Sequence, residues 1–445
     1  MRSGLIGAVV VVVVVAGCAS RSPIRAVPPE RTSLPPSTTS PQTHTTGTSD
    51  PTTRLPAPSP TRSPPVPPST VASSSCHAPP HALGPADGGW APTAASPLTG
   101  RDDAASAWTG TQLLVWGGNA TSMLTRPTPS TADGASYDPA TNSWCMLPPA
   151  PLSVTGPAVG AWTGSEFVVW SSAANAGAAF TPASRRWRTM PRSPLSERYG
   201  TSTVWTGKEL IVWGGFLQNV PRIETGDDGA AFDPSTRTWR LLPPGPSRRG
   251  EHLAVWDGNA MLVWGGGYEQ CGPDSCDQGA RADGMAYDPQ TNSWRPMSAS
   301  PLSARSGSLG AWDGAELLVI GGASPSGGSF AHDGAAYDPA ADRWRQIAPV
   351  PLKRWVLGGR AVWTGASLFV WDGGGAPVGG SGGGADYESL TFSPATDRWQ
   401  PVPASGLGEV ENPAVVWTGR DVIVWGGAFQ GVDTHGARNI GARYR

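Results

Sequence analysis

Hydrophobic and polar positions follow one pattern that is written seven times between about residue 89 and the end of the chain. A repeat with a period near fifty residues is typical of propellers and related arrays, so it decides the fold before any single residue does. One copy, residues 284–322, reads GMAYDPQTNSWRPMSASPLSARSGSLGAWDGAELLVIGG. Each unit contains four short stretches that predict β-strands, here called strands a to d.

The first unit shows where these strands and their turns are expected. Strand a is predicted over residues 104–108 and strand b over residues 113–116. Between them lies Thr109-Gly110, repeated as Thr-Gly or Asp-Gly in every unit, which predicts a two-residue type I′ hairpin turn. Strand b is almost wholly apolar, which suits a strand covered on both faces. Strand c ends in Asp138-Pro139, which predicts a type I turn before strand d.

Tryptophan residues form columns in three of the four strands, and Tyr or Phe forms a column in strand c. Strand a ends in Trp108, Trp162, Trp205, Trp256, Trp312, Trp363 and Trp417. Strand b ends in Trp116, Trp170, Trp213, Trp264, Ile320, Trp371 and Trp425. Strand d carries Trp144, Trp187, Trp239, Trp294, Trp344, Trp399 and, far upstream, Trp90. Because Ile320 replaces one Trp, and Phe alternates with Tyr in strand c, we interpret these positions as needing apolar volume rather than an indole or a phenol.

One unit is divided between the two ends of the repeated region. The stretch around Trp90 matches strand d, and the stretch around Tyr444 matches strand c of the same unit. The unit becomes whole only when these stretches lie side by side, so the array closes into a ring. We therefore predict an all-β fold, a seven-bladed β-propeller with four antiparallel strands per blade, closed by pairing of Trp90 with Tyr444.

The chain before the repeats predicts export and a spacer. Residues 1–18 combine Arg2, an apolar run too short to span a bilayer and Val15-Ala16-Gly17-Cys18. These four residues resemble the lipobox of bacterial lipoproteins, which implies that Cys18 is lipidated; an ordinary signal peptide is the alternative. Residues 19–88 are rich in Pro, Ser and Thr and predict a disordered tether, and residues 89–445 form the propeller. We expect the propeller outside the cytoplasmic membrane, anchored by lipid alone.

Charge and cysteine content narrow the classes of partner. The net charge is −2 and only 15% of residues are charged, so nothing favours binding to nucleic acid or to an acidic membrane.

With Cys18 lipidated, four cysteines remain in an exported protein, where disulfides form. Cys271 and Cys276 are close enough in sequence to pair, and a bond between Cys76 and Cys145 would fasten the tether to the first blade. No Cys-x₂-Cys or nearby His favours zinc.

A family resemblance is carried by the glycine pairs after strand b and the aromatic columns. The pairs begin at Gly117, Gly214, Gly265, Gly321 and Gly426, with departures at Ser171 and Asp372. This pattern resembles kelch repeats, which implies a kelch-type propeller over about four-fifths of the chain. Galactose oxidase resembles this architecture too, but its copper site needs Tyr, His and Cys ligands that are not set together here. We therefore expect no cofactor and no metal.

The recognition surface is expected where the repeats vary. The a–b and c–d turns share one face and hardly change in length, whereas the b–c and d–a loops share the other face and vary. Seven aromatic residues outside the columns fall in these loops: Tyr199, Phe216, Tyr268, Phe330, Trp355, Tyr387 and Phe429. Trp355 follows Arg354, and together with Tyr268 and Phe429 it suits a sugar ring or a partner side chain. Alternatively, these rings only pack the loops onto the blades.

A second candidate group is a partial ring of arginines. Arg101, Arg198, Arg249 and Arg305 each stand seven residues before the Trp of strand a. In kelch proteins the corresponding arginine often lines the central cavity, so the resemblance implies a site for a carboxylate, a phosphate or an acidic peptide. Structural ion pairs are the alternative, with partners drawn from Asp102, Glu197, Glu251, Glu409 and Glu411.

Three functions remain open from the sequence. The first is a surface-anchored, monomeric binding lipoprotein whose loop face recognises a glycan or a protein of the cell envelope. The second is a cofactor-free carbohydrate enzyme, such as a sugar mutarotase or epimerase, with Glu251 and His252 as acid–base residues. The third is a structural part of an envelope assembly. Fold alone does not decide among them.

Overall fold

The structure is a computed structural model that describes residues 76–77, 87–120, 131–154, 156–218, 220, 224–272, 275–324, 331–351, 358–372, 389–408, 410–430 and 435–445. Of residues 76, 77, 429, 430 and 435 it describes the backbone only. Within these ranges all regular secondary structure consists of β-strands. A helix long and apolar enough to cross a membrane is not found among the described residues.

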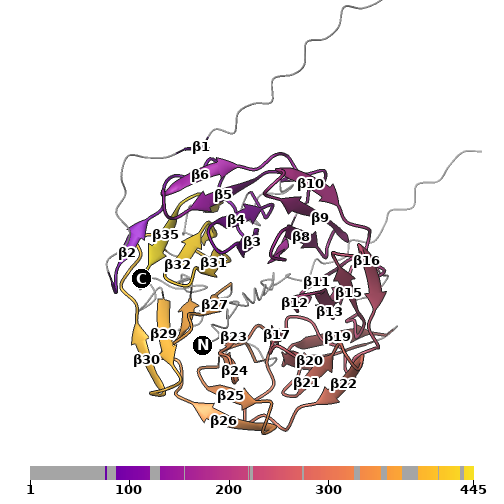
Figure 1. The fold of residues 1–445 in the computed structure, drawn as a ribbon. Helices are drawn as coiled ribbons and strands as arrows, with labels where there is room; N and C mark the ends of the chain where they lie inside the picture. Colours follow the sequence, from indigo (N-terminus) through magenta and orange to yellow (C-terminus); the bar gives the residue numbers. More distant parts are fainter. Residues whose placement is uncertain are drawn as a thin grey trace, which may run out of the picture. The chain divides into compact units, whose positions relative to one another are not determined.

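Seven antiparallel sheets follow one another around a ring, and each is one blade (Figure 1). Blade 1 contains β3 (Ala105–Trp108), β4 (Leu113–Trp116), β5 (Gly134–Asp138) and β6 (Ser143–Met146). Blade 2 contains β7 (Val159–Trp162), β8 (Phe167–Ser171), β9 (Ala176–Thr181) and β10 (Arg186–Thr189). Blade 3 contains β12 (Ser202–Trp205), β13 (Leu210–Trp213), β15 (Gly229–Asp233) and β16 (Thr238–Leu241). Blade 4 contains β17 (Leu253–Trp256), β18 (Met261–Trp264), β21 (Gly284–Asp288) and β22 (Ser293–Pro296).

The remaining blades complete the ring. Blade 5 contains β23 (Leu309–Trp312), β24 (Leu317–Ile320), β25 (Gly334–Asp338) and β26 (Arg343–Ile347). Blade 6 contains β27 (Arg360–Trp363), β28 (Leu368–Trp371), β29 (Ser389–Ser393) and β30 (Arg398–Pro401). Blade 7 contains β31 (Ala414–Trp417), β32 (Val422–Trp425), β35 (Gly441–Tyr444) and, from the start of the domain, β2 (Trp90–Pro92). The predicted fold class is therefore confirmed.

The a–b turn differs from the predicted type I′ turn. Thr109 pairs with Gln112, so the two central residues are Gly110, with φ of 98°, and Thr111. A positive φ at the first central residue only is the pattern of a type II′ turn. The Thr109 hydroxyl accepts the Gln112 N–H at 2.9 Å, and Asp257 and Asp313 use a carboxylate oxygen in the same way. This hydrogen bond explains why Thr or Asp recurs before the glycine.

The core lies between neighbouring blades. Strand b is fully buried in every blade, and each cluster of buried residues draws on two adjacent sheets. Leu318 and Ile320 of blade 5, for example, pack with Leu368 and Phe392 of blade 6. A fully buried aromatic or aliphatic side chain contributes roughly 2–3 kcal/mol, so the interfaces between blades, rather than single blades, stabilise the ring.

The indoles of strand d have a role that the sequence reading missed. Each of the seven donates its Nε1–H to a backbone carbonyl just after strand d of the preceding blade, at 2.7–3.0 Å. In strand b only three of the six indoles, those of Trp116, Trp213 and Trp371, donate to a backbone carbonyl. The indole nitrogens of Trp170, Trp264 and Trp425 are buried without an acceptor. Strand b therefore tolerates apolar volume without a hydrogen bond, as Ile320 shows, whereas every indole of strand d makes one.

Ring closure occurs at two distances from the axis. At the rim, β2 pairs with β35 in the register Trp90 to Tyr444, which confirms the predicted closure (Figure 1). Near the axis, the backbone N–H of Asp103 in blade 1 donates to the carbonyl of Asn412 in blade 7 at 3.0 Å. Glu251 donates in the same way to Gly200 of blade 3, so inter-blade backbone hydrogen bonds recur at this level.

One short strand lies outside the predicted propeller boundary. Strand β1 (Cys76–His77) pairs with β6 and adds a fifth strand to the rim of blade 1. These two residues belong to the segment 19–88 that is predicted to form a tether, most of which lies outside the described residues, so the tether stays a prediction. The outer edge of β6 has unpaired backbone groups, which gives an extended segment a place to pair.

Candidate functional site

The four predicted arginines are buried and paired. Each side chain is at most 1% exposed. Their carboxylate partners each stand immediately before strand c: Arg101–Asp133 (2.9 Å), Arg198–Asp228 (2.6 Å), Arg249–Asp283 (2.8 Å) and Arg305–Asp333 (2.7 Å). Each arginine also donates to the carbonyl of the first glycine in the pair after strand b. The donors are thus used within the blade.

The sequence carries a signal for these pairs, because Arg and Asp occur together in the same blades. The four blades with Arg at this position have Asp before strand c, whereas blades 2, 6 and 7 have Thr155, Val356 and Val410, and lack that Asp. Hydrogen bonds from Arg305 lower the pKa of Asp333, so the carboxylate is charged at neutral pH. In these four blades the arginine therefore holds the base of the b–c loop, and its partner is not one of the acids we had expected.

The proposed acid–base residues lie in unlike settings. His252 is buried, its Nε2 lies 2.7 Å from the Ser202 hydroxyl, and its ring packs edge-on against Trp213. Burial, followed by the positive charge of Arg249, lowers the pKa of His252 to about 3. The imidazole is therefore neutral at physiological pH and is not a proton donor there. Glu251 is also buried, with φ of 53°, and its backbone joins the inter-blade bonds near the axis.

Two small two-stranded sheets, linked by isolated β-bridges, lie on the loop face over blades 3 and 4, and together we call them the platform. It consists of β11 (Arg198–Tyr199), β14 (Phe216–Leu217), residues 224–225, β19 (Gly267–Cys271) and β20 (Cys276–Ala280). Strand β11 pairs with β14, Phe216 bridges to Thr225, and Glu224 bridges to Gln270 of the hairpin β19–β20. The platform joins b–c loops of two blades into one surface.

Two aromatic side chains fix the platform to the propeller. Phe216 packs over Gly250 so closely that a Cβ there would meet the ring at 2.5 Å. Tyr199 stacks on Phe216 with ring centroids 5.2 Å apart and is itself 40% exposed. Tyr199 and Phe216 thus pack a long loop onto the blades, which was the alternative reading of the loop aromatics.

A pocket of about 400 Å³, lined mainly by charged and amide residues, opens on the platform. Its lining consists of Thr225, Arg248, Tyr268, Glu269, Gln270, Asp277 and Arg281. The Arg281 guanidinium lies 4.3 Å from the centroid of the Tyr268 ring, in a cation–π arrangement. Arg248 donates to the Gln270 side-chain oxygen at 2.6 Å. The pocket therefore brings one predicted residue, Tyr268, together with two arginines and two carboxylates.

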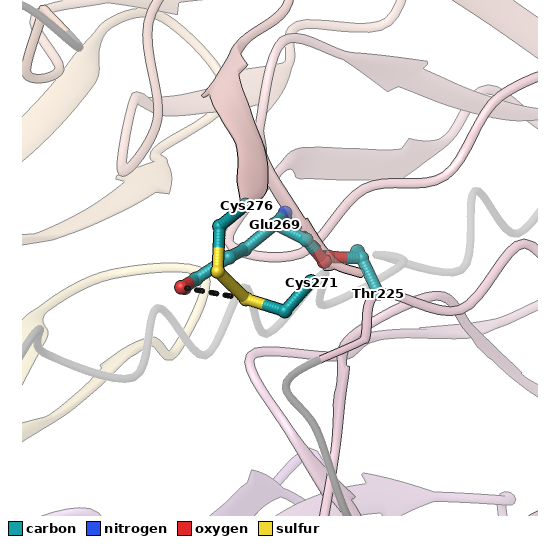
Figure 2. The surroundings of a disulfide bond; sticks show 4 residues. All are labelled: Thr225, Glu269, Cys271 and Cys276. Carbon is teal, nitrogen blue, oxygen red and sulfur yellow. Dashed lines mark hydrogen bonds between the residues drawn. A yellow bond between two sulfur atoms is a disulfide. The ribbon is translucent and has the colours of Figure 1, made fainter. Parts of the chain in front are cut away.

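A disulfide closes the hairpin that forms one wall of this pocket. Cys271 and Cys276 are bonded, as predicted, and they face each other across β19 and β20 (Figure 2). Glu269 lies beside them, and its backbone carbonyl and N–H bond to the Thr225 hydroxyl at 2.9 and 2.8 Å. Glu269 and these cysteines are also the one group of possible metal ligands in the described residues, but both sulfurs are joined to each other.

The second predicted cysteine pair is described in part. Cys76 of β1 lies opposite Cys145 of β6 in the register, and Cys145 takes part in a disulfide. This position agrees with a tether that is fastened to the rim of blade 1.

In a groove of about 540 Å³ on the opposite face, the acidic side chains already have partners. Asp257, Trp312, Glu316 and Asp338 are among its lining residues. Asp257 and Asp338 accept backbone N–H groups of their own turns, and Glu316 is paired with Arg345. These carboxylates belong to the repeated turns and not to a special site.

Several predicted residues fall outside the described part of the chain. Trp355, Arg354 and Cys18 are not described, and Phe429 is described only as a backbone position in β33 (Ala428–Gln430), which pairs with β34 (His435–Ala437).

The sequence reading missed Arg248, Arg281, Glu269 and Asp277. A usable signal was present, because the interval from strand b to strand c is longest in blade 4, at 23 residues, and contains the Cys271 pair.

Seven four-stranded blades closed around an axis define a β-propeller, and a pocket opens on its variable-loop face. The model of the KLHDC2/KLHL20/DRC7 Kelch-repeats domain matches residues 152–356, which span blades 2 to 5 and include the platform. Blades 2 to 5 are therefore similar to kelch repeats. No curated protein matches the chain.

Proposed function

We propose that this chain is an exported lipoprotein that displays its kelch propeller at the cell surface and binds a glycan of the cell envelope through the platform. Export and anchoring rest on residues 1–18, with Cys18 as the lipidated residue, and on the Pro-rich segment that follows. Kelch propellers commonly act as binding or scaffold domains. The variable loops on a rigid ring provide the usual place for recognition.

The composition of the pocket carries the choice of ligand class. None of the residues that line the pocket is aliphatic, and five of them have charged or amide side chains. The cores of protein–protein interfaces are apolar, with few charged residues. Sugar hydroxyls, in contrast, need planar polar side chains such as Arg, Gln and Asp, together with an aromatic ring. A glycan therefore suits this surface better than a protein.

Binding to fractionated envelope material tests the proposal. The full-length chain is incubated with polysaccharide and with protein fractions, and retained chain is measured for the wild type, Tyr268→Ala and Asn259→Ala. We expect retention by polysaccharide that falls at least tenfold in Tyr268→Ala and is unchanged in Asn259→Ala, because Asn259 lies in the groove of the opposite face. Retention by protein fractions alone, or equal retention of both variants, would overturn the proposal.

Lipid anchoring is tested by metabolic labelling of cells that express the full-length chain. Labelled fatty acid should appear in the wild-type chain and be lost in Cys18→Ala, while a chain that carries no label in either form would contradict the lipoprotein assignment.

A further inference from the structure

We infer that the platform pocket recognises a carboxylated sugar, and that the Arg281 guanidinium is the group that binds the carboxylate. This inference rests on the proposed function and names the ligand class of the same site. The four repeated arginines each have an aspartate partner, whereas Arg281 has none among the described residues.

Arg281 is held in place but its donors are unused. Its backbone N–H donates to the Gly266 carbonyl at 2.8 Å, and its own carbonyl accepts the Arg305 N–H at 3.1 Å. The side chain stacks on Tyr268, whose ring in turn lies over Gly279, where a Cβ would meet the ring at 3.1 Å. Arg281 Nε is buried and has no hydrogen-bond acceptor, and no ion pair of Arg281 occurs among the described residues. A fixed guanidinium without an acceptor is a preorganised anion receptor.

The other side chains of the pocket limit the charge of the ligand. Glu269 and Asp277 balance the charges of Arg248 and Arg281, so the lining is neutral overall. A dianionic phosphate would meet repulsion from the two carboxylates. A ligand with one carboxylate and several hydroxyls fits both kinds of group, because its hydroxyls donate to Glu269 and Asp277 while its carboxylate accepts from Arg281. A uronic acid has this chemistry.

The supporting residues keep the pocket open for such a ligand. Gln270 holds Arg248 through its side-chain oxygen, and the Thr225 hydroxyl is used by the backbone of Glu269. A volume of about 400 Å³ lies within the range of small-ligand sites, so the pocket suits one or two sugar rings.

Calorimetric titration of the full-length chain tests the inference. The probes are a glucuronate tetrasaccharide, the neutral glucose tetrasaccharide, inorganic phosphate and a tri-glutamate peptide. We expect the glucuronate probe to bind at least tenfold more tightly than the other three. Arg281→Met should weaken this binding at least tenfold, and Arg281→Lys should also weaken it because the planar fork is lost. Tyr268→Phe keeps the stacked ring and should bind within threefold of the wild type.

Two controls separate binding from folding and from the broader proposal. Arg420→Met removes an exposed arginine on the opposite face and should bind like the wild type, and thermal unfolding of every variant should match. Equal binding of the neutral tetrasaccharide, of phosphate or of the peptide, or an unchanged affinity in Arg281→Met, would overturn the inference. If polysaccharide fractions are retained through Tyr268 but glucuronate does not bind, the inference fails and the proposed function stands. If no polysaccharide is retained, both fail.

Discussion

Arginine and aspartate occur on the loop face in two settings, and the contrast separates scaffold from site. In the repeated setting, Arg305 is 1% exposed and shares its donors with Asp333 and backbone carbonyls. In the platform, Arg281 stacks on Tyr268 without an acceptor, and Asp277 is exposed at the pocket. Residues that recur at one position in several blades serve the ring. Residues that occur once, in the longest loop, remain available for a ligand.

The largest expected effect comes from removing a repeated carboxylate. Asp333→Ala leaves the buried Arg305 guanidinium without its counter-charge, and removing one partner of a buried pair costs about 3–5 kcal/mol. Asp333 is itself half exposed, so we expect a loss near the lower end, about 3 kcal/mol of unfolding free energy. Asp277→Ala in the platform should change stability by less than about 0.5 kcal/mol. Urea unfolding measures both, and equal losses would contradict the distinction.

A smaller effect should appear when the buried indoles of two strands are compared. Trp144 in strand d and Trp264 in strand b are both fully buried, but only Trp144 donates its N–H, to the Ala94 carbonyl at 3.0 Å. Replacing either by Phe removes similar volume, and only Trp144→Phe also removes a buried hydrogen bond. We expect Trp144→Phe to cost about 1–2 kcal/mol more than Trp264→Phe in the same unfolding experiment. Equal costs would show that strand d also needs only volume.

The pH dependence of stability tests a buried carboxylate that does not recur. Burial, followed by the negative charge of Asp103, raises the pKa of Asp102 to about 8, above the usual 3.8. The folded state then holds a proton that the unfolded state releases, so this group makes stability fall as pH rises from about 4 to about 8. Asp102→Asn should remove part of this slope, on the order of 1–3 kcal/mol between pH 5 and pH 8. Parallel slopes for the wild type and the variant would contradict this.

The smallest effect on global stability is expected from the platform disulfide. In Cys271→Ser/Cys276→Ser the hairpin β19–β20 should open more often, because it lies outside the seven blade sheets. We expect faster hydrogen exchange at Glu269 and Gln270, unchanged exchange over β18 and a loss of less than about 1 kcal/mol in unfolding free energy. If the double variant instead shows faster exchange in all seven blades, the platform belongs to the cooperative folding unit of the propeller.

The sequence predicted the ring well because ring formation depends on periodic features. Strand b was predicted at residues 113–116 and is found there, and the divided unit at Trp90 and Tyr444 fixed the number of blades. The turn type was wrong because the pairing of Thr109 with Gln112 shifts the central residues by one position. The strand-d indole bonds reach a different blade, so no pattern within one repeat reveals them.

The candidate site was harder to predict because it depends on contacts between loops. Tyr268 was found as an aromatic residue outside the columns, but its partner Arg281 is thirteen residues away in a loop without periodicity. The repeated arginines looked like a ligand-binding ring because their partners, such as Asp133, lie about thirty residues downstream. Blades with the Arg also have the Asp, and blades without the Arg lack it. This co-occurrence indicates that the two residues pair with each other rather than bind a ligand.

Closure at the rim also makes the starting point of the ring arbitrary. The Gly88 N–H donates to the Arg445 carbonyl at 2.7 Å, so a short linker can connect these two positions directly. New termini opened in a d–a connection, such as that between β22 and β23, then yield a circular permutant in which no sheet is assembled from distant segments. We expect such a permutant to refold faster than the natural order, because its last blade no longer depends on meeting the first.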